Sequence, residues 1–597
     1  MTTTPSSAPT TVTKGGAWLI EDVTTESTFT PERMTSEHLL IGKTAEKFTA
    51  EVIQQTSQLE TKDWNLARQM LKRSGDLGLL GTDVPETYGG LELDKVSSAI
   101  IAGRLGQAGS FSSAFGAHTG LAILPIQMFG TDAQKQKYLP GLVSGETVGA
   151  YCLSETASGS DALAAKTLAV RQADGGFVLT GEKMWITNGG FADLYIVFAK
   201  VDGTHFTAFI VERSFEGVTS GKEERKMGLH GSSTTPVFFQ DVRVPAGNLL
   251  GEIGKGHKVA FNVLNYGRFK LGASTIGGAQ TAIRESARYA KARQQFGQPI
   301  ASFGAIRHKL GEMTVRAYAI ESMVFRTAGL IDAAIEQDEN QRDRSKDVAV
   351  LRALEEYAIE SSILKVACSE TLQYILDENI QIHGGNGFVK DYPAERYYRD
   401  SRVNRIFEGT NEINRLLIPS MLIKRALKDE LPLIEAAKKL EGEIMTPAIE
   451  ASHEKDVLEV NAASVTMFKK VSLAVIAVAL RKYGEKLHTQ QEILSLTSDI
   501  LIDTYGADSA ITRAMAATEI GIPNKHLQVD AAACFVNDAA MRIEIAARSA
   551  LAAMTEGDTL RTHLIALRRL LKVTPVNAVA IRRRLADATV ERSAYLF

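Results

Sequence analysis

The region that most constrains this chain is a run of short apolar segments between Cys152 and Gly251. Two pairs of these segments are each joined by a tight turn, at Asp174–Gly176 and at Asp202-Gly203, and Pro236–Pro245 adds a further strand. Glycine turns between alternating or apolar runs are typical of β-hairpins. Because no helical segment separates the runs, we expect an antiparallel sheet or barrel and exclude a doubly wound parallel sheet.

Helical periodicity occupies the chain on both sides of this region. Asn65–Leu80 and Val96–Gly109 place apolar residues three and four apart, and the same pattern returns after Gly256 and lasts to the C-terminus. A charged break at Asp429–Pro432 sets off a last helical segment of typical domain size. The sequence therefore predicts a multidomain α+β protein in the order α, β, α, α. The expected parts are a disordered tail and lead-in (1–36), an N-terminal helical domain (37–150), a middle β-domain (151–254), a helical bundle domain (255–430) and an additional C-terminal helical domain (431–597).

Composition narrows the class of protein. The 597 residues are 44% hydrophobic, which is ample for several cores, and 67 basic against 70 acidic residues give a net charge of −3, which argues against a nucleic-acid partner. Only Cys152, Cys368 and Cys534 are present, so no disulfide framework forms and a cytoplasmic location is expected. No HExxH or CxxC spacing supports a metal site. Residues 1–13 are rich in Thr, Ser and Pro and are predicted to be disordered.

Four polar or glycine-rich segments depart from the background, although each has an ordinary structural alternative. Tyr151–Asp161 is rich in hydroxyl groups and could be a polar loop or could bind a planar, heteroatom-rich ligand. Trp185–Asn188 could be a core segment, and Arg293–Gly297 could be a solvated helix end. Gln381–Phe388 is either a plain glycine turn or a set of backbone amides able to approach a pyrophosphate.

The fifth such segment is Arg405–Ile413, in which Glu408 lies between an apolar run and Gly409. Thr410 or Asn411 could cap a helix that begins here. A carboxylate at a helix N-terminus is stabilised in its charged form, which lowers its pKa. A carboxylate base in a dry pocket has a raised pKa instead. The sequence leaves the two interpretations of Glu408 open.

Taken together, these motifs resemble the acyl-CoA dehydrogenase family over about residues 37–430. The resemblance is specific because six separate motifs occur in the family's order: YCLSETASGSD, WITN, NYGRF, RQQFG, IQIHGGNGF and IFEGTNEI. The long C-terminal extension makes the very-long-chain subgroup, with its additional helical domain, the nearest match. The implied fold is an N-terminal helical domain, a middle antiparallel β-barrel and a helical bundle domain.

The resemblance implies FAD as the cofactor and acyl-CoA as the substrate. On the middle domain, the implied flavin-binding residues are Tyr151, Leu153, Ser154, Ser160, Trp185, Ile186 and Thr187. On the helical domain they are Arg293, Phe296, Gln381, Gly384, Gly385, Thr410 and Glu412. In the family, the counterparts of Arg293, Phe296, Gln381 and Gly385 reach the flavin of a neighbouring subunit, which implies a homodimer at least. The implied substrate-binding residues are Ser160, Asn265, Arg268 and Gly409.

Glu408 matches the family's catalytic base, which removes the α-proton of the thioester while the β-hydride passes to flavin N5. Some members carry the base one position before the arginine of the substrate segment, and here that position is Gly267, which has no side chain. Thr156 stands where the family has proline, and NYGRF lacks the acidic first residue of medium-chain members. Gly116 and Gly120 would leave room for a long acyl chain.

The implied reaction is α,β-dehydrogenation of long-chain acyl-CoA to trans-2-enoyl-CoA in fatty acid β-oxidation, with electrons passed to an electron-transfer flavoprotein. An acyl-CoA oxidase and a respiratory assembly or scaffold protein are the alternatives. Val471–Leu480 has basic ends, which fits either a packed helix or one on an anionic membrane. Residues 561–597 are also basic. The subgroup resemblance favours peripheral contact with the inner membrane through the C-terminal domain.

Overall fold

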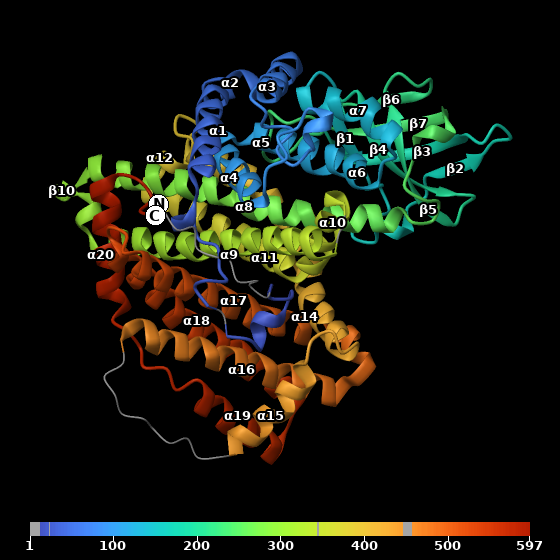
Figure 1. Cartoon of the computed structure of the whole chain (residues 1–597). Helices are drawn as coiled ribbons and strands as arrows, with labels where there is room; N and C mark the ends of the chain where they lie inside the picture. The colour runs from blue at the N-terminus through green and yellow to red at the C-terminus, as the bar shows by residue number, and fades with distance from the viewer. Residues whose placement is uncertain (1–11, 23, 343–344, 446–455) are drawn as a thin grey trace, which may run out of the picture.

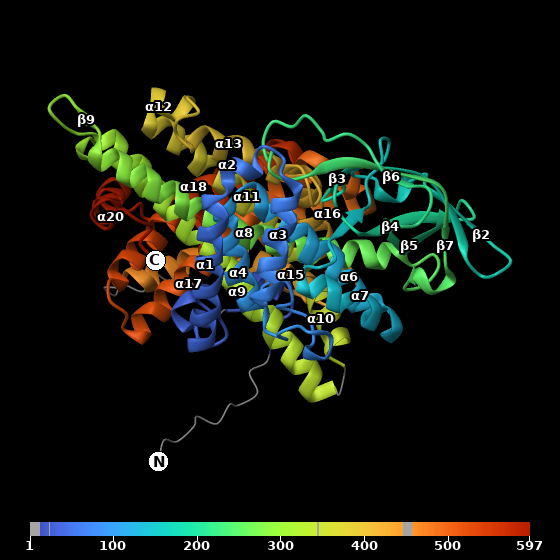
Figure 2. The same ribbon diagram turned by 90° about the horizontal axis from the view of Figure 1, so that it is seen from above.

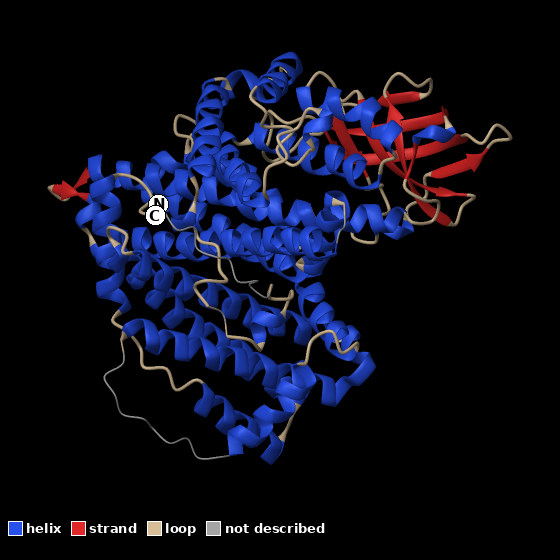
Figure 3. Cartoon of the chain, in the orientation of Figure 1, coloured by secondary structure: helices blue, strands red, loops and turns tan. Residues whose placement is uncertain are grey.

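The computed structural model describes residues 12–22, 24–342, 345–445 and 456–597. Three long helices form its central layer, α8 (Gly256–Ala292), α9 (Gly304–Arg342) and α11 (Ala358–His383). Figure 1 shows N-terminal helices on one side of this layer, C-terminal helices on the other and the sheet at one end. Figure 3 shows the strands gathered in one body, apart from a small hairpin at the opposite end of the central helices. The expected α, β, α, α order is therefore confirmed.

The helices around the central layer fall into three groups by position in the chain. The N-terminal group is α1 (Ser36–Gln54), α2 (Thr56–Leu59), α3 (Trp64–Asp76), α4 (Lys95–Leu105), α5 (Ser110–Gly116), the π-helical turn η5 (Ala117–Ile123), α6 (Leu124–Phe129) and α7 (Asp132–Ser144). Shorter helices of the bundle domain are α10 (Lys346–Glu356), α12 (Gly385–Phe388) and α13 (Ala394–Ser401). The chain then continues through α14 (Asn411–Leu427), α15 (Leu433–Met445), α16 (Val457–Tyr483), α17 (Gln491–Ile520), α18 (Lys525–Met554), α19 (Gly557–Leu570) and α20 (Ala578–Arg592).

The middle domain is a sheet in the order β6-β7-β3-β2-β4-β5-β8, with β1 beside β4. Its strands are β1 (Gly149–Cys152), β2 (Leu168–Arg171), β3 (Phe177–Thr187), β4 (Leu194–Val201), β5 (His205–Glu212), β6 (Val218–Ser220), β7 (Thr234–Val244) and β8 (Leu249–Leu250). Both expected hairpins are present, β2–β3 and β4–β5. The sheet is mixed, however, because β1 and β2 pair with β4 in parallel. Tight turns dictate only the antiparallel pairing of consecutive strands, and the loop between β1 and β2 returns the chain in the same direction.

Glycines allow the N-terminal helices to lie directly on α8. A Cβ added at Gly277 would lie 1.8 Å from the carbonyl oxygen of Gly103, and one at Gly106 would lie 1.9 Å from that of Ser274. No side chain fits at such distances, so the two backbones are in contact. This explains the glycine-rich character of α8 and fixes its position below α4.

The described part of the lead-in is packed into the protein. Trp18 is 1% exposed, and its Nε1 and the Gly16 N–H both donate to Glu360 Oε1, at 3.0 and 2.7 Å. The centroid of the Trp18 ring lies 5.0 Å from that of the Tyr505 ring in the C-terminal domain. The lead-in therefore joins the bundle to the C-terminal domain. Figure 2, turned by 90°, again shows the sheet at one end of the long helices and the small hairpin at the other. The disorder predicted for residues 1–13 falls, except for Val12 and Thr13, outside the described residues.

The apolar run Val471–Leu480 lies within α16, in the core of the C-terminal domain. Among the described residues, the stretch Val457–Thr489 is long and apolar enough to cross a membrane by length and composition, and 61% of its most apolar window is buried in the protein. Four of the cations near this run are bound within the chain: Lys469 by Asp508, Lys470 by Glu443, Arg481 by Glu441 and Lys482 by the Met554 carbonyl. Of the two interpretations that the sequence left open, the structure supports the packed helix and gives no support to membrane contact.

Candidate active site

Glu408 occupies a sharp turn between the short helix Arg402–Arg405 and α14. Its φ is +58°, and that of Gly409 is +78°. A positive φ is uncommon for a residue with a side chain, and such strain is concentrated at functional sites. Thr410 then caps α14, since its side chain accepts a hydrogen bond from the Ile413 N–H at 3.2 Å. The predicted cap is therefore present, and Glu412 lies in the first turn of the helix.

Two side chains, those of Asn414 and Arg268, bind the backbone of this turn. Asn414 Nδ2 lies within hydrogen-bond distance of the carbonyls of Glu408 (3.4 Å), Gly409 (2.9 Å) and Thr410 (3.0 Å). Arg268 Nε donates to the Glu408 carbonyl at 3.1 Å, and its Nη1 donates to Asn265 Oδ1 at 3.1 Å. The structure thus brings Asn265, Arg268 and Gly409 to Glu408, as the resemblance implies. Asn414 was not predicted, because an amide inside an amphipathic helix has no distinctive sequence signal.

The carboxyl group of Glu408 fills the space that a side chain at position 267 would need. A Cβ added at Gly267 would lie 2.7 Å from Glu408 Oε2 and 3.0 Å from Oε1. Oε2 is buried and has no hydrogen-bond partner among the described residues. Burial raises the pKa of Glu408 to about 7, against the opposing charges of Arg268 and Lys365. The lowered pKa of a carboxylate at a helix N-terminus is therefore not what the structure shows.

The hydroxyl-rich loop and the tryptophan strand lie side by side near this carboxyl group. The Met184 N–H donates to the Ser154 carbonyl at 2.9 Å, which places Leu153 and Ser154 next to Trp185. Trp185 has a φ of +57° and is 56% exposed, in a β-bulge of β3. The Tyr151 hydroxyl is buried and has no hydrogen-bond partner in the described part of the chain, and burial and the Glu408 charge both raise its pKa. The exposed indole of Trp185 is available to a ligand at this end of β3. Of the other predicted residues, Ile186 is buried, Thr187 is partly exposed and Ser160 is exposed on the loop.

A buried ion pair, which sequence reasoning missed, fixes the loop after β1. Lys183 Nζ donates to Glu155 Oε1 at 2.7 Å and to the Leu153 carbonyl at 3.2 Å. Glu155 also accepts a hydrogen bond from the Thr167 hydroxyl at 2.6 Å. At Thr156, where the family has proline, the hydroxyl donates to Glu182 Oε1 at 2.8 Å. This hydrogen bond to β3 therefore restrains the loop at Thr156, where a proline would restrain the backbone directly.

The remaining predicted cofactor residues lie at the other end of the central helices. Phe296 is 92% exposed, with a φ of +51°, at the tip of the hairpin formed by β9 (Gln294–Gln295) and β10 (Gln298–Pro299). Arg293 lies between α8 and the first strand of this hairpin. The hairpin lies at the end of α8 farthest from the sheet (Figure 1). Gln381, Gly384 and Gly385 are exposed near the same end, and no atom lies within 4 Å of a Cβ added at either glycine. One chain alone does not bring these residues to Trp185 and Glu408.

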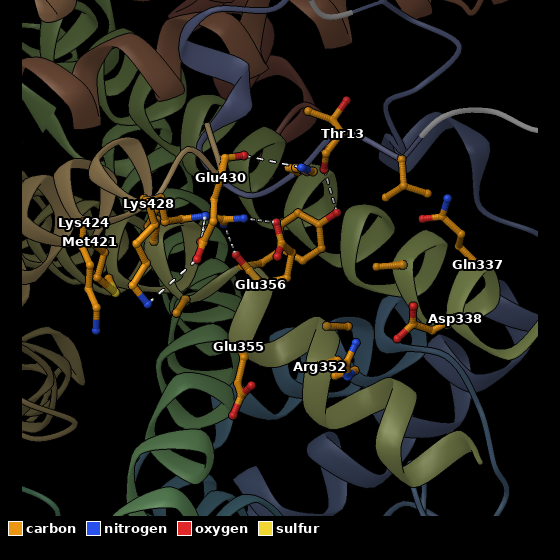
Figure 4. A pocket seen from close by; sticks show the side chains of 18 residues that line it. Thr13, Gln337, Asp338, Arg352, Glu355, Glu356, Met421, Lys424, Lys428 and Glu430 are labelled. Carbon is orange, nitrogen blue, oxygen red and sulfur yellow. Dashed lines mark hydrogen bonds and ion pairs between the residues drawn. The ribbon is translucent and has the colours of Figure 1, made fainter. Parts of the chain in front are cut away.

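A separate cavity of about 690 Å³ contains none of the predicted site residues. Figure 4 shows charged side chains around it, from the lead-in, α9, α10 and the end of α14. Polar groups of the lining bind one another: Arg425 Nη2 contacts Glu356 Oε1 at 2.6 Å, and the Tyr357 hydroxyl donates to the Thr13 carbonyl at 2.8 Å. The cavity is therefore a polar junction between domains. Arg425 Nε is buried there without a hydrogen bond among the described residues, but it lies 3.4 Å from Glu430 Oε2 in an ion pair and so does not point to a ligand.

Comparison with known proteins identifies the family. Domain models described as the acyl-CoA dehydrogenase N-terminal, middle and C-terminal domains match residues 35–146, 150–242 and 254–422, and another C-terminal domain model of the same description matches 467–569. This chain belongs to the acyl-CoA dehydrogenase family.

Relatives with this organisation extend over the whole chain. A probable acyl-CoA dehydrogenase of Bacillus subtilis is 49% identical over 98% of both chains. The crystal structure of an acyl-CoA dehydrogenase complexed with FAD from Bacillus anthracis has a TM-score of 0.96 and 47% identity, and the match covers 98% of this chain and 100% of the other. The human mitochondrial very long-chain specific acyl-CoA dehydrogenase is 41% identical over 58% of this chain and 51% of its own length.

Proposed function

We propose that this protein is an FAD-dependent acyl-CoA dehydrogenase that converts a long-chain acyl-CoA to its trans-2-enoyl-CoA in fatty acid β-oxidation. The observation that carries the proposal is the Glu408 carboxyl group, which is buried against Gly267 with one oxygen unpartnered. A carboxylate with a pKa of about 7 is matched to removing a proton near neutral pH. The family membership and the FAD complex of the Bacillus anthracis relative support the same activity.

The residues present fit a flavin dinucleotide. Exposed Trp185 offers an aromatic face. The Tyr151 hydroxyl and Glu408 Oε2 have no hydrogen-bond partner among the described residues. Gly384 and Gly385 leave the backbone open to a pyrophosphate. Leu153 to Ser160 and Trp185 to Thr187 would hold the ring and ribityl end, and Thr410 and Glu412 would lie along the dinucleotide. When bound, FAD supplies the acceptor for the β-hydride.

The chain itself supplies the base and the polarising group. Glu408 takes the α-proton onto a carboxylate oxygen, while Arg268 and Asn414 keep its backbone in the strained turn. The Glu408 N–H makes no hydrogen bond among the described residues, so it is free to donate to the thioester carbonyl as negative charge develops there. Ser160, Asn265 and Gly409 would contact the acyl-CoA.

The proposed course of a long acyl chain runs from Glu408 along α8. No atom lies within 4 Å of a Cβ added at Gly116, on α5 beside α8. Further along, a cavity of about 80 Å³ is lined by residues that include Ser112, Ser274 and Gly278. At about 1.5 Å per residue, Ser274 and Gly278 lie about 10 and 16 Å along α8 from Gly267. An extended chain with C–C bonds of about 1.5 Å advances about 1.3 Å per carbon, so these positions correspond to about 8 to 13 carbons.

The proposal also includes the electron acceptor and the oligomeric state of the protein. An electron-transfer flavoprotein is the acceptor that the family resemblance implies. The exposed Phe296 hairpin, far from Trp185 in its own chain, supports a homodimer in which Arg293, Phe296 and Gln381 complete the partner's flavin site. The intact Glu408 turn argues against a scaffold role alone.

The test is the visible spectrum of the purified protein, followed by anaerobic titration with acyl-CoAs of increasing length. Long chains should bleach a yellow flavin in the wild type but not in Glu408→Gln. A colourless protein that takes up no FAD would overturn the proposal. Admitting air after bleaching separates the two reactions, since rapid reoxidation with formation of peroxide would indicate an acyl-CoA oxidase.

A further inference from the structure

Lys365 on α11 differs from the other buried lysines of the described residues. Lys95, Lys183 and Lys469 each have a carboxylate oxygen within 3.2 Å, from Asp83, Glu155 and Asp508 respectively. Lys365 is 0% exposed, yet no carboxylate lies within ion-pair distance of its ammonium group in the part of the chain that the structure describes. A buried charge without a paired partner is costly, so its retention calls for an explanation.

The ammonium group of Lys365 is held by an amide at the start of the catalytic helix. Its Nζ donates to Asn411 Oδ1 at 2.5 Å, and Asn411 is the first residue of α14, three positions after Glu408. Asn411 Oδ1 also accepts from the Ser369 hydroxyl at 3.3 Å, and its Nδ2 donates to Glu370 Oε1 at 2.9 Å. Lys365 is therefore fixed beneath the turn that carries Glu408.

Glu370, the acidic residue near Lys365 on α11, is paired with another cation, Arg415. Glu370 receives two hydrogen bonds from Arg415, at 2.7 and 2.8 Å, and Arg415 Nε also donates to Asp499 on α17 at 2.8 Å. Glu370 is thus neutralised by a guanidinium that the C-terminal domain holds in place. The positive charge of Lys365 therefore lies beside the start of α14, and no carboxylate of the described residues is paired with it.

We propose that Lys365 is a positioning residue for Glu408: its ammonium group, fixed by Asn411, supplies the positive field that keeps the buried carboxylate ionised and able to accept a proton. In the reaction, the proton passes from the substrate α-carbon to a Glu408 oxygen, while Lys365 neither gains nor loses one. This inference rests on the proposed function of Glu408.

The charges around Lys365 are consistent with this role. Burial lowers its pKa to about 7, and the charge that opposes this most is Glu408. Arg268 on α8 lowers the pKa further, whereas Glu412 on α14 and Glu370 on α11 raise it. Reciprocally, Arg268 and Lys365 are the two cations that lower the pKa of Glu408 against its burial. Two cations therefore share one catalytic carboxylate.

The test compares Lys365→Gln, which can still donate to Asn411 but has no charge, with Lys365→Arg, which keeps the charge. Lys469→Gln, which removes a buried lysine from the C-terminal domain, is the matched control. The measurement is the rate of flavin reduction by a long-chain acyl-CoA as a function of pH, in single turnover. In Lys365→Gln the acid limb should move up by about one pH unit. The rate on that limb should fall about tenfold and stay within about twofold at alkaline pH, whereas Lys365→Arg and Lys469→Gln should keep the wild-type profile.

A readout independent of turnover is the infrared titration of the protonated Glu408 carboxyl band, identified as the band missing in Glu408→Gln. Its midpoint should rise in Lys365→Gln by the same amount as the rate profile. A wild-type midpoint and profile in Lys365→Gln would overturn the inference while leaving the proposed function intact. Bleaching by substrate in Glu408→Gln would overturn the proposed function itself. Should Lys365→Gln not fold, the same titration is made on Asn411→Ala, in which the ammonium loses its anchor, and an unchanged midpoint would again overturn the inference.

Discussion

Two regions of this molecule bury charged side chains, and they do so in opposite ways. Where the C-terminal domain meets α9, Arg513 is 1% exposed and contacts both Glu32 and Glu321 at 2.8 Å. Glu321 accepts a further hydrogen bond from the Tyr595 hydroxyl at 2.9 Å. Around Glu408, by contrast, three buried side-chain oxygens have no partner among the described residues: Glu408 Oε2, the Tyr151 hydroxyl and Asn414 Oδ1.

The contrast distinguishes charged groups that stabilise the fold from charged groups that are available to a ligand. A buried ion pair whose hydrogen bonds are complete leaves nothing for a substrate to satisfy. A buried carboxyl group with a free oxygen, in a strained turn, leaves an unsatisfied group whose cost is tolerated only where function needs it. We expect substitutions in the first region to change stability, and those in the second to change chemistry.

The largest effect is expected from Glu408→Gln. The amide keeps the shape of the side chain but cannot accept the proton, so the rate of flavin reduction should fall about a thousandfold or more. Stopped-flow measurement at saturating long-chain acyl-CoA checks this, with FAD content measured in parallel. A rate within tenfold of the wild type would mean that another group is the base.

Arg513→Met tests the first region, where we expect a loss of stability without a change in chemistry. Removing the guanidinium leaves Glu32 and Glu321 buried without their cation, so the free energy of unfolding should fall by about 3 to 5 kcal/mol. Denaturant unfolding measures this, and the exposed pair of Arg561 with Asp558 gives the control: Arg561→Ala should cost less than about 1 kcal/mol. If the pH profile of Arg513→Met also moved, the two regions would not be separable.

Gly267→Ala should disturb chemistry with little effect on stability. The new methyl group would meet the end of the flexible Glu408 side chain, which can move aside, but the carboxylate would then leave its working position. We expect flavin reduction to slow about a hundredfold. Gly247→Ala, in open space, is the control and should be without effect. A wild-type rate of flavin reduction in Gly267→Ala, or a large loss of its thermal stability relative to Gly247→Ala, would contradict the assignment.

The smallest expected effect is a pH-dependent stabilisation in Glu408→Gln. The folded pKa of about 7 lies above the ordinary value of 4.5, so the folded protein binds the proton more tightly than the unfolded chain. The associated stability is present below pH 4.5 and is lost as pH rises through 7. The variant should therefore gain about 1 to 2 kcal/mol over the wild type on going from about pH 5 to about pH 8, after allowance for partial exposure. Parallel unfolding curves at the two pH values would contradict this.

Much of the fold could be predicted from the sequence because its signals are local. The turns at Asp174–Gly176 and Asp202-Gly203 specify the hairpins β2–β3 and β4–β5, and the break at Asp429–Pro432 lies between α14 and α15. The parallel pairing of β1 and β2 with β4 could not be predicted, because it depends on the course of a loop. Nor could the packing of Trp18 against Tyr505, which joins residues almost five hundred positions apart.

For the candidate site, the sequence by itself determined which segments carry chemistry: the motif around Glu408, the NYGRF segment and the two segments that end β1 and β3. It could not decide the state of Glu408, because a cap and a base share the same local pattern. Only the tertiary structure decided that burial against Gly267 outweighs the helix N-terminus. It also placed Lys365 at the start of α14, with Asn411 as its partner and no paired carboxylate among the residues that the structure describes. The physical reason is that desolvation and long-range charge depend on everything packed around a group, and neighbours in sequence supply only part of that surrounding.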